Sequence, residues 1–182
     1  MRAPLSEESD EEMAKVFGDV ETMKYLSHLC RNGEFDAGDA RTRREEDTQR
    51  MEEGTGCNFE IMMEEEEEDG AGLVYIGLVG YRRIYVGEGG EGRVGEIGIV
   101  IDKAFWGRGL GKEAMEGAMK HGLESVEKGG LGLDVISGST KEVNIPMIAL
   151  FASMGMAKVP GQEEKAGDPE AWIEFRTAPN HG

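Results

Sequence analysis

The stretch from position 96 to position 112 contains the residues whose types and spacing point most directly to chemistry. Three of them are glycines that alternate with other residues just before a helical pattern, namely Gly107, Gly109 and Gly111. Glycine allows a sharp turn from strand to helix, and the backbone N–H groups of such a turn lie at the positive end of the helix. Arg108 and Lys112 add positive charge at the same place. The pattern predicts an anion site suited to a pyrophosphate group.

Other nucleotide-binding motifs fit the chain less well. A Walker A loop needs a further glycine at position 106 and a Ser or Thr after the lysine, but the chain has Trp106 and Glu113 there. The segment GEGGEG at 87–92 has dinucleotide-binding spacing, yet it connects two predicted strands instead of opening a helix, so we attribute the match to chance. The alternative for 107–111 is an ordinary glycine-rich turn without a ligand.

The first third of the chain is predicted to be helical. Ser9 and Glu12 have the spacing of a capping box, and apolar residues follow at helical intervals. Asp19 can cap a second short helix. The segment Asp39–Glu53 is almost entirely charged, and its Arg and Glu residues can pair at i,i+4, so it is predicted to form a solvated helix.

The rest of the chain alternates between strand and helix patterns. Strands are predicted at 57–63, 73–86, 93–102, 131–136 and 171–176, and the second and third of these form an antiparallel hairpin. Helices are predicted from Lys112 to about Val126 and from Asn144 to a stop at Gly155. The acidic run Glu64–Asp69 is predicted to be a mobile hairpin loop, because like charges repel and stay hydrated. This order indicates one α+β or α/β domain with a mixed sheet.

Composition and charge exclude several classes of protein. The 182 residues carry a net charge of −17, which argues against nucleic acid and anionic membranes as partners. No stretch approaches the ~20 apolar residues of a membrane span, and the acidic segment MRAPLSEESDEE has no signal-peptide core. Cys30 and Cys57 have neither paired spacing nor clustered histidines nearby, so we expect no metal site, no disulfide and a cytoplasmic location.

On these motifs, the chain resembles the GNAT acetyltransferases. FWGRGLGKEAM is similar to the loop with which that family binds the pyrophosphate of acetyl-CoA, and Gly109 and Gly111 match the family pattern. The resemblance extends upstream to GEIGIVID and downstream to NIPMIALFASMGM, and it covers roughly Asn58–Arg176. The aromatic residue, Trp and Gly before the loop resemble the branch that contains the ribosomal-protein N-terminal and spermidine acetyltransferases.

The resemblance implies one GNAT acyl-CoA N-acyltransferase domain over residues 1–182, with a mostly antiparallel central sheet flanked by helices. Residues 1–56 would form a helical acceptor-side part, and residues 57–178 the sheet and the acetyl-CoA-binding core. The sequence departs from the family pattern in several places. Trp106 stands where Gln or Arg is more common, Met147 replaces a serine, and Phe151 replaces a tyrosine that many members use as general acid. Only MRAPLS remains where the family has its first strand.

The resemblance also implies roles in the transfer of an acetyl group from acetyl-CoA to an amine. An alkyl amine has a pKa of ~10.4 and arrives protonated, so a base must remove a proton. Glu96 matches the family's strand glutamate that acts as base, directly or through water; the alternative is an exposed strand carboxylate. A splay between strands 93–102 and 131–136 would admit the pantetheine arm of acetyl-CoA. The implied cofactor-binding residues are Ile99, Val100, Ile101, Trp106, Gly107, Arg108, Gly109, Leu110, Gly111, Lys112, Asn144 and Phe151.

Two of these residues have open alternatives. Asn144 would contact the pantetheine or its ordered water, and a helix N-cap is an alternative role that can coexist. Phe151 cannot donate a proton, so water, Tyr81, Tyr85 or no group at all would protonate the leaving thiolate. A thiol has a pKa near ~8.5, so a dedicated acid is dispensable.

The acceptor is expected to be a small-molecule primary amine or a peptide N-terminus. By the resemblance, Asp39–Glu53 and Glu64–Asp69 border the acceptor side, so a cationic acceptor is predicted; the alternative is that the acidity only keeps the protein soluble. A non-catalytic acyl-CoA-binding or sensing domain is the alternative function, which Met147 and Phe151 favour, and a scaffold with a fortuitous loop is a third. We expect a monomer or a homodimer.

Overall fold

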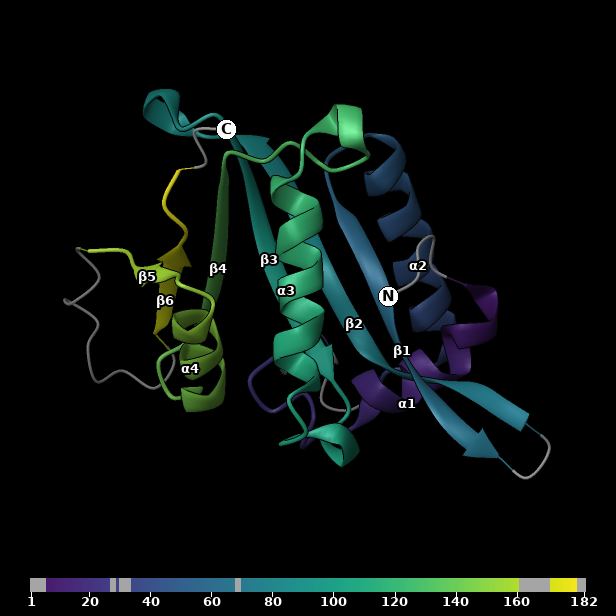
Figure 1. Ribbon diagram of the computed structural model, residues 1–182. Helices are drawn as coiled ribbons and strands as arrows, with labels where there is room; N and C mark the ends of the chain where they lie inside the picture. Colours follow the sequence, from purple (N-terminus) through teal and green to yellow (C-terminus); the bar gives the residue numbers. More distant parts are fainter. Residues whose placement is uncertain (1–5, 27–28, 30–33, 68–69, 161–170, 180–182) are drawn as a thin grey trace.

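The central element of the fold is a twisted sheet, in which the strand order is β1-β2-β3-β4-β6-β5 (Figure 1). The computed structural model describes residues 1–182 except 1–5, 27–28, 30–33, 68–69, 161–170 and 180–182. The strands are β1 Cys57–Glu67, β2 Gly70–Val86, β3 Arg93–Ile101, β4 Val135–Lys141, β5 Ala157–Lys158 and β6 Trp172–Arg176. Neighbouring strands are antiparallel except β3 and β4, which are parallel. The predicted mixed, mostly antiparallel sheet is confirmed.

Helices cover both faces of this sheet (Figure 1). The α-helices are α1 Asp10–Gly18, α2 Ala37–Glu52, α3 Leu110–Leu123 and α4 Ile145–Ser153, and the short 3-10 helices are η1 Glu7–Ser9, η4 Glu88–Gly90, η5 Lys103–Phe105 and η6 Val126–Lys128. One core lies between α1 and β2, where Phe17 and Met13 pack with Leu78. The larger core lies under α3 and α4, where Met115 and Phe151 pack with Ile136.

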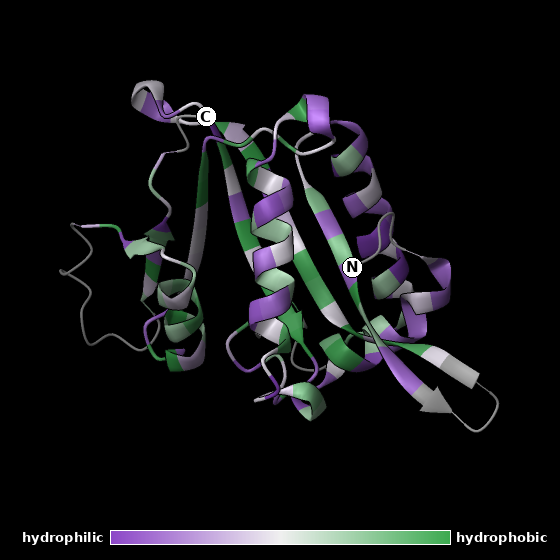
Figure 2. Ribbon diagram, in the orientation of Figure 1, coloured by the Kyte–Doolittle hydropathy of each residue, from purple (hydrophilic) through white to green (hydrophobic). Residues whose placement is uncertain are grey.

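Helix α2 is held mainly by polar contacts. It is largely hydrophilic (Figure 2), and its buried residues are Ala40 and Asp47. Arg44 on α2 donates from Nε to Oδ1 of Asp10 on α1 over 2.9 Å, and both side chains are nearly buried. Because the carboxylate stabilises the charged guanidinium, the pKa of Arg44 is raised. The predicted charged helix is confirmed, but it is not solvated all round, because Asp47 and the ion pair of Arg44 lie against the rest of the protein.

The beginning of the chain differs from the sequence expectation at two caps. Ser9 makes no side-chain cap hydrogen bond with α1; instead, Ser6 accepts from the Glu8 N–H at the start of η1. A capping box does occur at α2, where the side chain of Asp36 accepts from Gly38 and Asp39. Residues 20–25 form turns instead of a second helix, because Asp19 accepts from the Thr22 N–H and the chain does not continue into helical hydrogen bonding.

The acidic run also differs from the expectation of a mobile loop. Glu64–Glu67 continue β1 and pair with residues 70–73 of β2, so the hairpin projects beyond the rest of the sheet (Figure 1). Its tip, at 68–69, lies outside the described residues. Strand pairing therefore continues through this run in spite of the like charges of neighbouring glutamates. The predicted strand at 131–136 begins later, at Val135, because the backbone of Leu131 and Leu133 bonds to the end of α3. No strand precedes α1 in the part of the chain that is described.

The parallel pairing between β3 and β4 is short. It joins only Val94–Glu96 to Val135–Ser137, although β3 continues to Ile101 against β2 and β4 continues to Lys141 against β6. Phe151 of α4 is fully buried at this point, and a Cβ added at Gly138 would lie 2.5 Å from its Cζ. The aromatic ring therefore fills the space directly against the β4 backbone. Beyond Glu96 and Ser137 the two strands diverge, as the resemblance implied (Figure 1).

Tyr81 gives a direct test of the packing between the sheet and α3. Its hydroxyl donates to the Ala118 carbonyl over 3.0 Å, and a Cβ added at Gly122 would collide with that hydroxyl. We expect Gly122→Ala to lower the free energy of unfolding by about 1–3 kcal/mol, because the buried phenol has to move. Gly111→Ala in the same helix meets no atom closer than 3.6 Å. It should leave stability unchanged or raise it by up to about 1 kcal/mol. Urea denaturation of both variants checks this, and equal midpoints would contradict the packing described.

Candidate functional site

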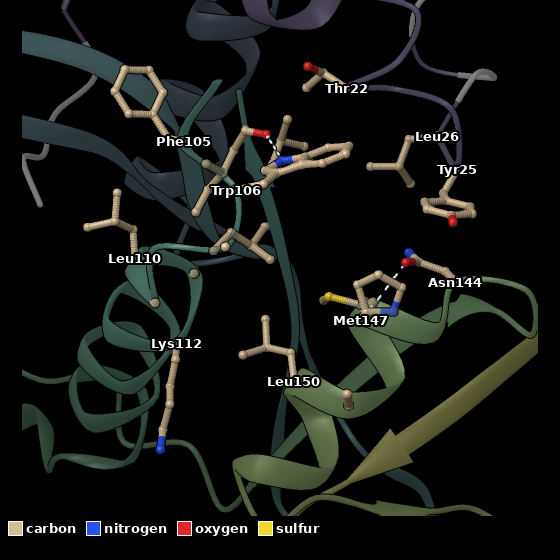
Figure 3. A pocket seen from close by; sticks show the side chains of 18 of the residues that line it. Thr22, Tyr25, Leu26, Phe105, Trp106, Leu110, Lys112, Asn144, Met147 and Leu150 are labelled. Carbon is tan, nitrogen blue, oxygen red and sulfur yellow. Dashed lines mark hydrogen bonds between the residues drawn. The ribbon is translucent and has the colours of Figure 1, made fainter. Parts of the chain in front are cut away.

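A cleft of about 560 Å³ lies beside the divergent part of β3. Its walls come from the end of β3, the glycine turn with the start of α3, helix α4, and the segment from Thr22 to Leu26 (Figure 3). Of the cofactor-binding residues predicted from the sequence, the cleft brings together all except Arg108 and Phe151: Ile99, Val100, Ile101, Trp106, Gly107, Gly109, Leu110, Gly111, Lys112 and Asn144. The size suits a molecule larger than an amino acid.

The glycine turn has the geometry of an anion cradle. Gly107 and Gly109 have φ angles of +74° and +80°, in the left-handed region that favours glycine. A Cβ added at either position would meet no protein atom within 4 Å, so both backbones face open space. Gly109 is also the N-cap of the 14-residue helix α3, whose first N–H groups lack helical acceptors. A bound anion would satisfy these groups and interact favourably with the helix dipole.

The charged side chains on the cleft are positive. Among the described residues, Lys24 and Lys112 line it, whereas the whole chain has a net charge of −17. Arg108 does not line the cleft; its guanidinium lies 5.2 Å from the centre of the Phe105 ring. Each lysine is also paired with a carboxylate that does not line the cleft: Lys24 Nζ donates to Glu21 Oε1 over 2.7 Å, and Lys112 Nζ lies 3.8 Å from Glu116 Oε1. The charged groups that line the cleft itself are still positive, which suits an anionic ligand.

Trp106 has a structural role in addition to lining the cleft. Its indole Nε1 donates to the Ile101 carbonyl over 2.8 Å, which fixes the glycine turn against the end of β3 (Figure 3). The Nζ atom of Lys24 lies 5.1 Å from the centre of the Trp106 ring. The ring thus positions one of the two lysines by a cation–π contact.

The segment from Asp19 to Leu26 forms a wall of the cleft that the sequence did not reveal. Lys103 Nζ donates to Oδ2 of Asp19 over 2.6 Å, and the Lys103 N–H donates to the Thr22 hydroxyl over 3.2 Å. The hydrogen bond from Lys103 lowers the pKa of Asp19 to about 2, and it raises the pKa of Lys103. The segment was predicted as a helix on its apolar spacing, and no local signal indicates that Tyr25 and Leu26 face a ligand cleft.

Helix α4 contributes the opposite wall. Oδ1 of Asn144 accepts from the Met147 N–H over 3.3 Å, and its Nδ2 donates to the Thr140 hydroxyl over 2.9 Å (Figure 3). The alternative of a helix N-cap is therefore observed, and it leaves part of the Asn144 amide free for a ligand. Met147 and Leu150 line the cleft next to it. Phe151 does not reach the cleft: it is fully buried and lies against Phe175 in the core.

Glu96 lies outside this cleft, in a second and smaller pocket of about 110 Å³. The two cavities share Leu26, Ile99 and Val100, so they meet at the end of β3. Glu96 is 8% exposed, and its Oε1 accepts a hydrogen bond from the guanidinium of Arg82. Its Oε2 lies 3.7 Å from Nε of Arg83, which is beyond hydrogen-bond distance. A shift in the β2–β3 register between Tyr81 and Arg83 brings both arginines near Glu96.

Neither tyrosine proposed as a general acid from the sequence reaches the two cavities. Tyr81 is fully buried under α3, and burial raises the pKa of its phenol strongly. Tyr85 stacks against the guanidinium of Arg83, 4.4 Å from its ring centre, and lines neither cavity. Tyr25 is the tyrosine that lines the main cleft.

The described residues include no group of three or more His, Cys, Asp and Glu side chains placed to hold a metal ion. None of the described helices is both long enough and apolar enough to cross a membrane.

The sequence profile of the family "Acetyltransferase (GNAT) domain" matches residues 1–157, which is most of the chain. The protein belongs to the GNAT acetyltransferase family. No curated protein is significantly similar to it in sequence.

Solved GNAT structures share the fold at low sequence identity. A ribosomal L7/L12 α-N-protein acetyltransferase, RimL, bound to coenzyme A, has a TM-score of 0.73 and 11% identity, over 96% of this chain and 90% of that one. The ribosomal-protein-S5-alanine acetyltransferase of Vibrio fischeri has a TM-score of 0.70 and 14% identity, over 97% and 91%. The microcin C7 self-immunity acetyltransferase MccE, bound to acetyl-CoA and AMP, has a TM-score of 0.68 and 12% identity, over 95% and 88%.

The glycine turn of this GNAT domain allows a matched test of anion binding. Gly109 and Gly129 have similar φ angles, +80° and +86°, and open surroundings, but only Gly109 lines the cleft. Each change to Ala should lower the free energy of unfolding by about 1–2 kcal/mol, because both residues have left-handed backbone conformations that alanine disfavours. Acetyl-CoA at about a hundredfold its Kd should stabilise the wild type and Gly129→Ala by ~2.7 kcal/mol, a rise of several degrees in Tm.

The same rise should be largely lost in Gly109→Ala, because the added Cβ projects toward the phosphate position. Differential scanning fluorimetry of the three proteins provides the measurement. An equal rise in all three, or none in the wild type, would contradict the assignment of the cleft.

Proposed function

We propose that this GNAT domain transfers an acetyl group from acetyl-CoA to a primary amine, where its two cavities meet. The observation that supports this most is their shared boundary at Leu26, Ile99 and Val100. A ligand that fills the larger cleft and a second that enters the smaller pocket would touch each other only there. Two substrates of a direct transfer reaction need such a meeting point, because holding the reacting groups together supplies much of the rate enhancement.

The larger cleft fits acetyl-CoA. The pyrophosphate would lie on the N–H groups of the glycine turn at Gly107–Gly111, with Lys112 beside it. The pantetheine arm would pass between α3 and α4 along Ile99–Ile101, where β3 has lost β4 as a partner. Its amides could then bond to strand backbone as a neighbouring strand would. Asn144 stands at the side of this path with part of its amide available.

Bound acetyl-CoA supplies a thioester, and transfer of its acetyl group to the amine nitrogen yields an amide and the free thiol of CoA. Glu96 would accept the proton that the protonated amine must lose. One of its oxygens is held by Arg82, and the other has no hydrogen bond from Arg83. The carboxylate is thus fixed in place with one oxygen left for the acceptor. A backbone N–H at the end of β3 would polarise the thioester carbonyl.

Protonation of the leaving sulfur does not depend on Phe151, Tyr81 or Tyr85. Tyr25 lines the larger cleft and carries a hydroxyl, so it can donate a proton if one is needed. Water reaching the open cleft can do the same.

The acceptor itself is a small amine or a peptide N-terminus; two of the structural neighbours are named for ribosomal proteins and a third was solved with AMP. We place the protein in the cytoplasm.

A non-catalytic acyl-CoA-binding domain is the second candidate. The ion pair between Arg82 and Glu96 favours it, because it gives Glu96 a structural role that does not involve an amine substrate. Both candidates predict that acetyl-CoA binds. They differ in whether free CoA thiol appears when amines are added, and a thiol-reactive dye reports this directly. Thiol release with none of a broad panel of amines and peptides would favour the binding domain.

The role of Glu96 is tested by Glu96→Gln, which keeps the shape and removes the base. We expect kcat to fall by about 10²-fold or more and the acid limb of the pH–rate profile to flatten, while acetyl-CoA affinity is unchanged. Glu91→Gln is the matched control, because Glu91 also pairs with an arginine, Arg176, over 2.7 Å, but lines neither cavity. Equal rates for the two variants would remove Glu96 from the chemistry.

A further inference from the structure

The smaller pocket has a charge opposite to that of the protein. It lies on the α1 and α2 side of the sheet, and the charged residues that line it in the described part of the chain are Arg43, Arg82 and Glu96. Two arginines against one glutamate leave an excess of positive charge, in a chain whose formal charge is −17. The surface acidity therefore does not extend into this pocket.

Arg82 and Glu96 balance each other, so the excess charge belongs to Arg43. Arg82 is bonded to Glu96, and the Arg82 side chain is 63% exposed. Arg43 comes from α2, and its nearest carboxylate oxygen is Oδ2 of Asp47, 3.7 Å from its Nε. Asp47 is already held by Arg50, over 2.6 Å. Arg50 uses only Oδ1 of Asp47, and Oδ2 is buried without a hydrogen-bond partner among the described residues, so Asp47 compensates part of the charge of Arg43 without a hydrogen bond.

The guanidinium of Arg43 is also short of hydrogen-bond acceptors. Its Nε is buried and faces Oδ2 of Asp47 at 3.7 Å, and its two terminal nitrogens make no hydrogen bond to the described residues, with the side chain 24% exposed. It lies 4.9 Å from the centre of the Phe17 ring, which holds its plane in place. An arginine that is partly buried, oriented and left with unused donors suits a carboxylate, which can accept two parallel hydrogen bonds.

The floor of the pocket has no side chain at its centre. Gly80 of β2 and Gly98 of β3 face each other in the register of the sheet, and both line the pocket. A Cβ at Gly98 would meet no protein atom within 4 Å, so the space above it is open. Ile99 and Val100, the next two residues of β3, line both this pocket and the larger cleft.

The acidic segments that led to the prediction of a cationic acceptor do not line this pocket. Glu64–Glu67 belong to the projecting hairpin of β1 and β2 (Figure 1), and neither Glu64 nor Glu65, whose side chains the structure describes, lines either cavity. Helix α2 does border the pocket, but it contributes Arg43 and none of its own carboxylates. The predicted carboxylates do not line this pocket; Asp39 and Glu46 of α2 instead line a separate cavity of about 170 Å³ together with Glu34 and Arg43.

We infer that the acceptor is a primary amine that carries a carboxylate a few bonds away, with the carboxylate on Arg43 and the amine near Glu96. This inference rests on the proposed acetyl transfer. The pocket volume of about 110 Å³ admits a small amino acid or the first residue of a peptide. In the reaction the protonated amine gives one proton to Glu96, and the new N–C bond forms as the C–S bond breaks. The nitrogen then loses its second proton, and the sulfur takes up one proton, so an amide and a free thiol result. The carboxylate of the acceptor is unchanged.

The inference is tested with three acceptors of equal length: 3-aminopropanoate, 3-aminopropanamide and 1,3-diaminopropane. They present an anionic, a neutral and a cationic group at the same distance from the amine. We expect kcat/KM to be about tenfold or more higher for 3-aminopropanoate than for the other two, because a charge-assisted bidentate contact is lost in each. Two tripeptide amides, one beginning with Asp and one with Asn, are compared in the same way. A preference for the Asp peptide indicates a peptide terminus as the source of the carboxylate, and transfer to neither indicates a free amino acid.

Variants assign the preference to this pocket. Arg43→Gln should abolish the advantage of 3-aminopropanoate over 3-aminopropanamide, with acetyl-CoA binding unchanged. Gly98→Val should block all three acceptors, because its side chain enters the open space of the pocket. Arg41→Gln is the control on the same helix: Arg41 is 65% exposed and lines neither cavity, and its variant should behave as the wild type.

Binding measured without turnover separates this inference from the proposed function. Saturation-transfer NMR of the three amines is recorded on the protein saturated with CoA. Binding of 3-aminopropanoate that depends on Arg43 supports the inference even if no acetyl transfer occurs, and the proposed transfer then fails alone. Transfer that favours 1,3-diaminopropane, or a preference that Arg43→Gln leaves intact, overturns the inference while the proposed transfer stands.

Discussion

The early end of the pairing between β3 and β4 is the constraint on which both cavities depend. Three residue pairs join the strands, and after Glu96 and Ser137 each strand keeps only its outer neighbour. The ring of Phe151, packed against Gly138, occupies the space beneath β4 at this point. The edge of β3 that faces β4 is consequently left without a strand partner beyond Glu96, and backbone groups on that edge need another source of hydrogen bonds. A ligand with amide groups of its own can supply them.

Most of the charged residues that line the two cavities are positive, although the net charge of the protein is negative. The excess of acidic residues lies on exposed parts such as the projecting hairpin and the outer side of α2, whereas Lys24, Lys112 and Arg43 border the cavities. Exposed charges beyond a Debye length of ~8 Å are largely screened at physiological salt, so the nearest side chains dominate the potential felt by a ligand. Net charge therefore predicts solubility and excluded partners better than it predicts what a pocket binds.

Sequence reasoning recovered the parts of the fold and site that depend on local patterns. A run rich in β-branched and aromatic residues predicted β2 and its hairpin partner β3, and the glycine spacing at 107–111 predicted the turn before α3. It missed what depends on long-range contacts. The wall at Asp19–Leu26 is set by Lys103, far along the chain, and the extension of β1 through Glu64–Glu67 is set by pairing with β2. The position of Arg43 beside Glu96 depends on how α2 lies over the sheet, which no motif records.

The central claim is that one ligand runs through the larger cleft and ends where the smaller pocket begins. A crystal structure of the protein with CoA tests this most directly. The account predicts the pyrophosphate on the backbone of Gly107–Gly111, the pantetheine along Ile99–Ile101 between the divergent strands, and the sulfur beside Val100. A structure with CoA bound elsewhere, or with β3 and β4 paired beyond Ser137 and the path closed, would contradict it.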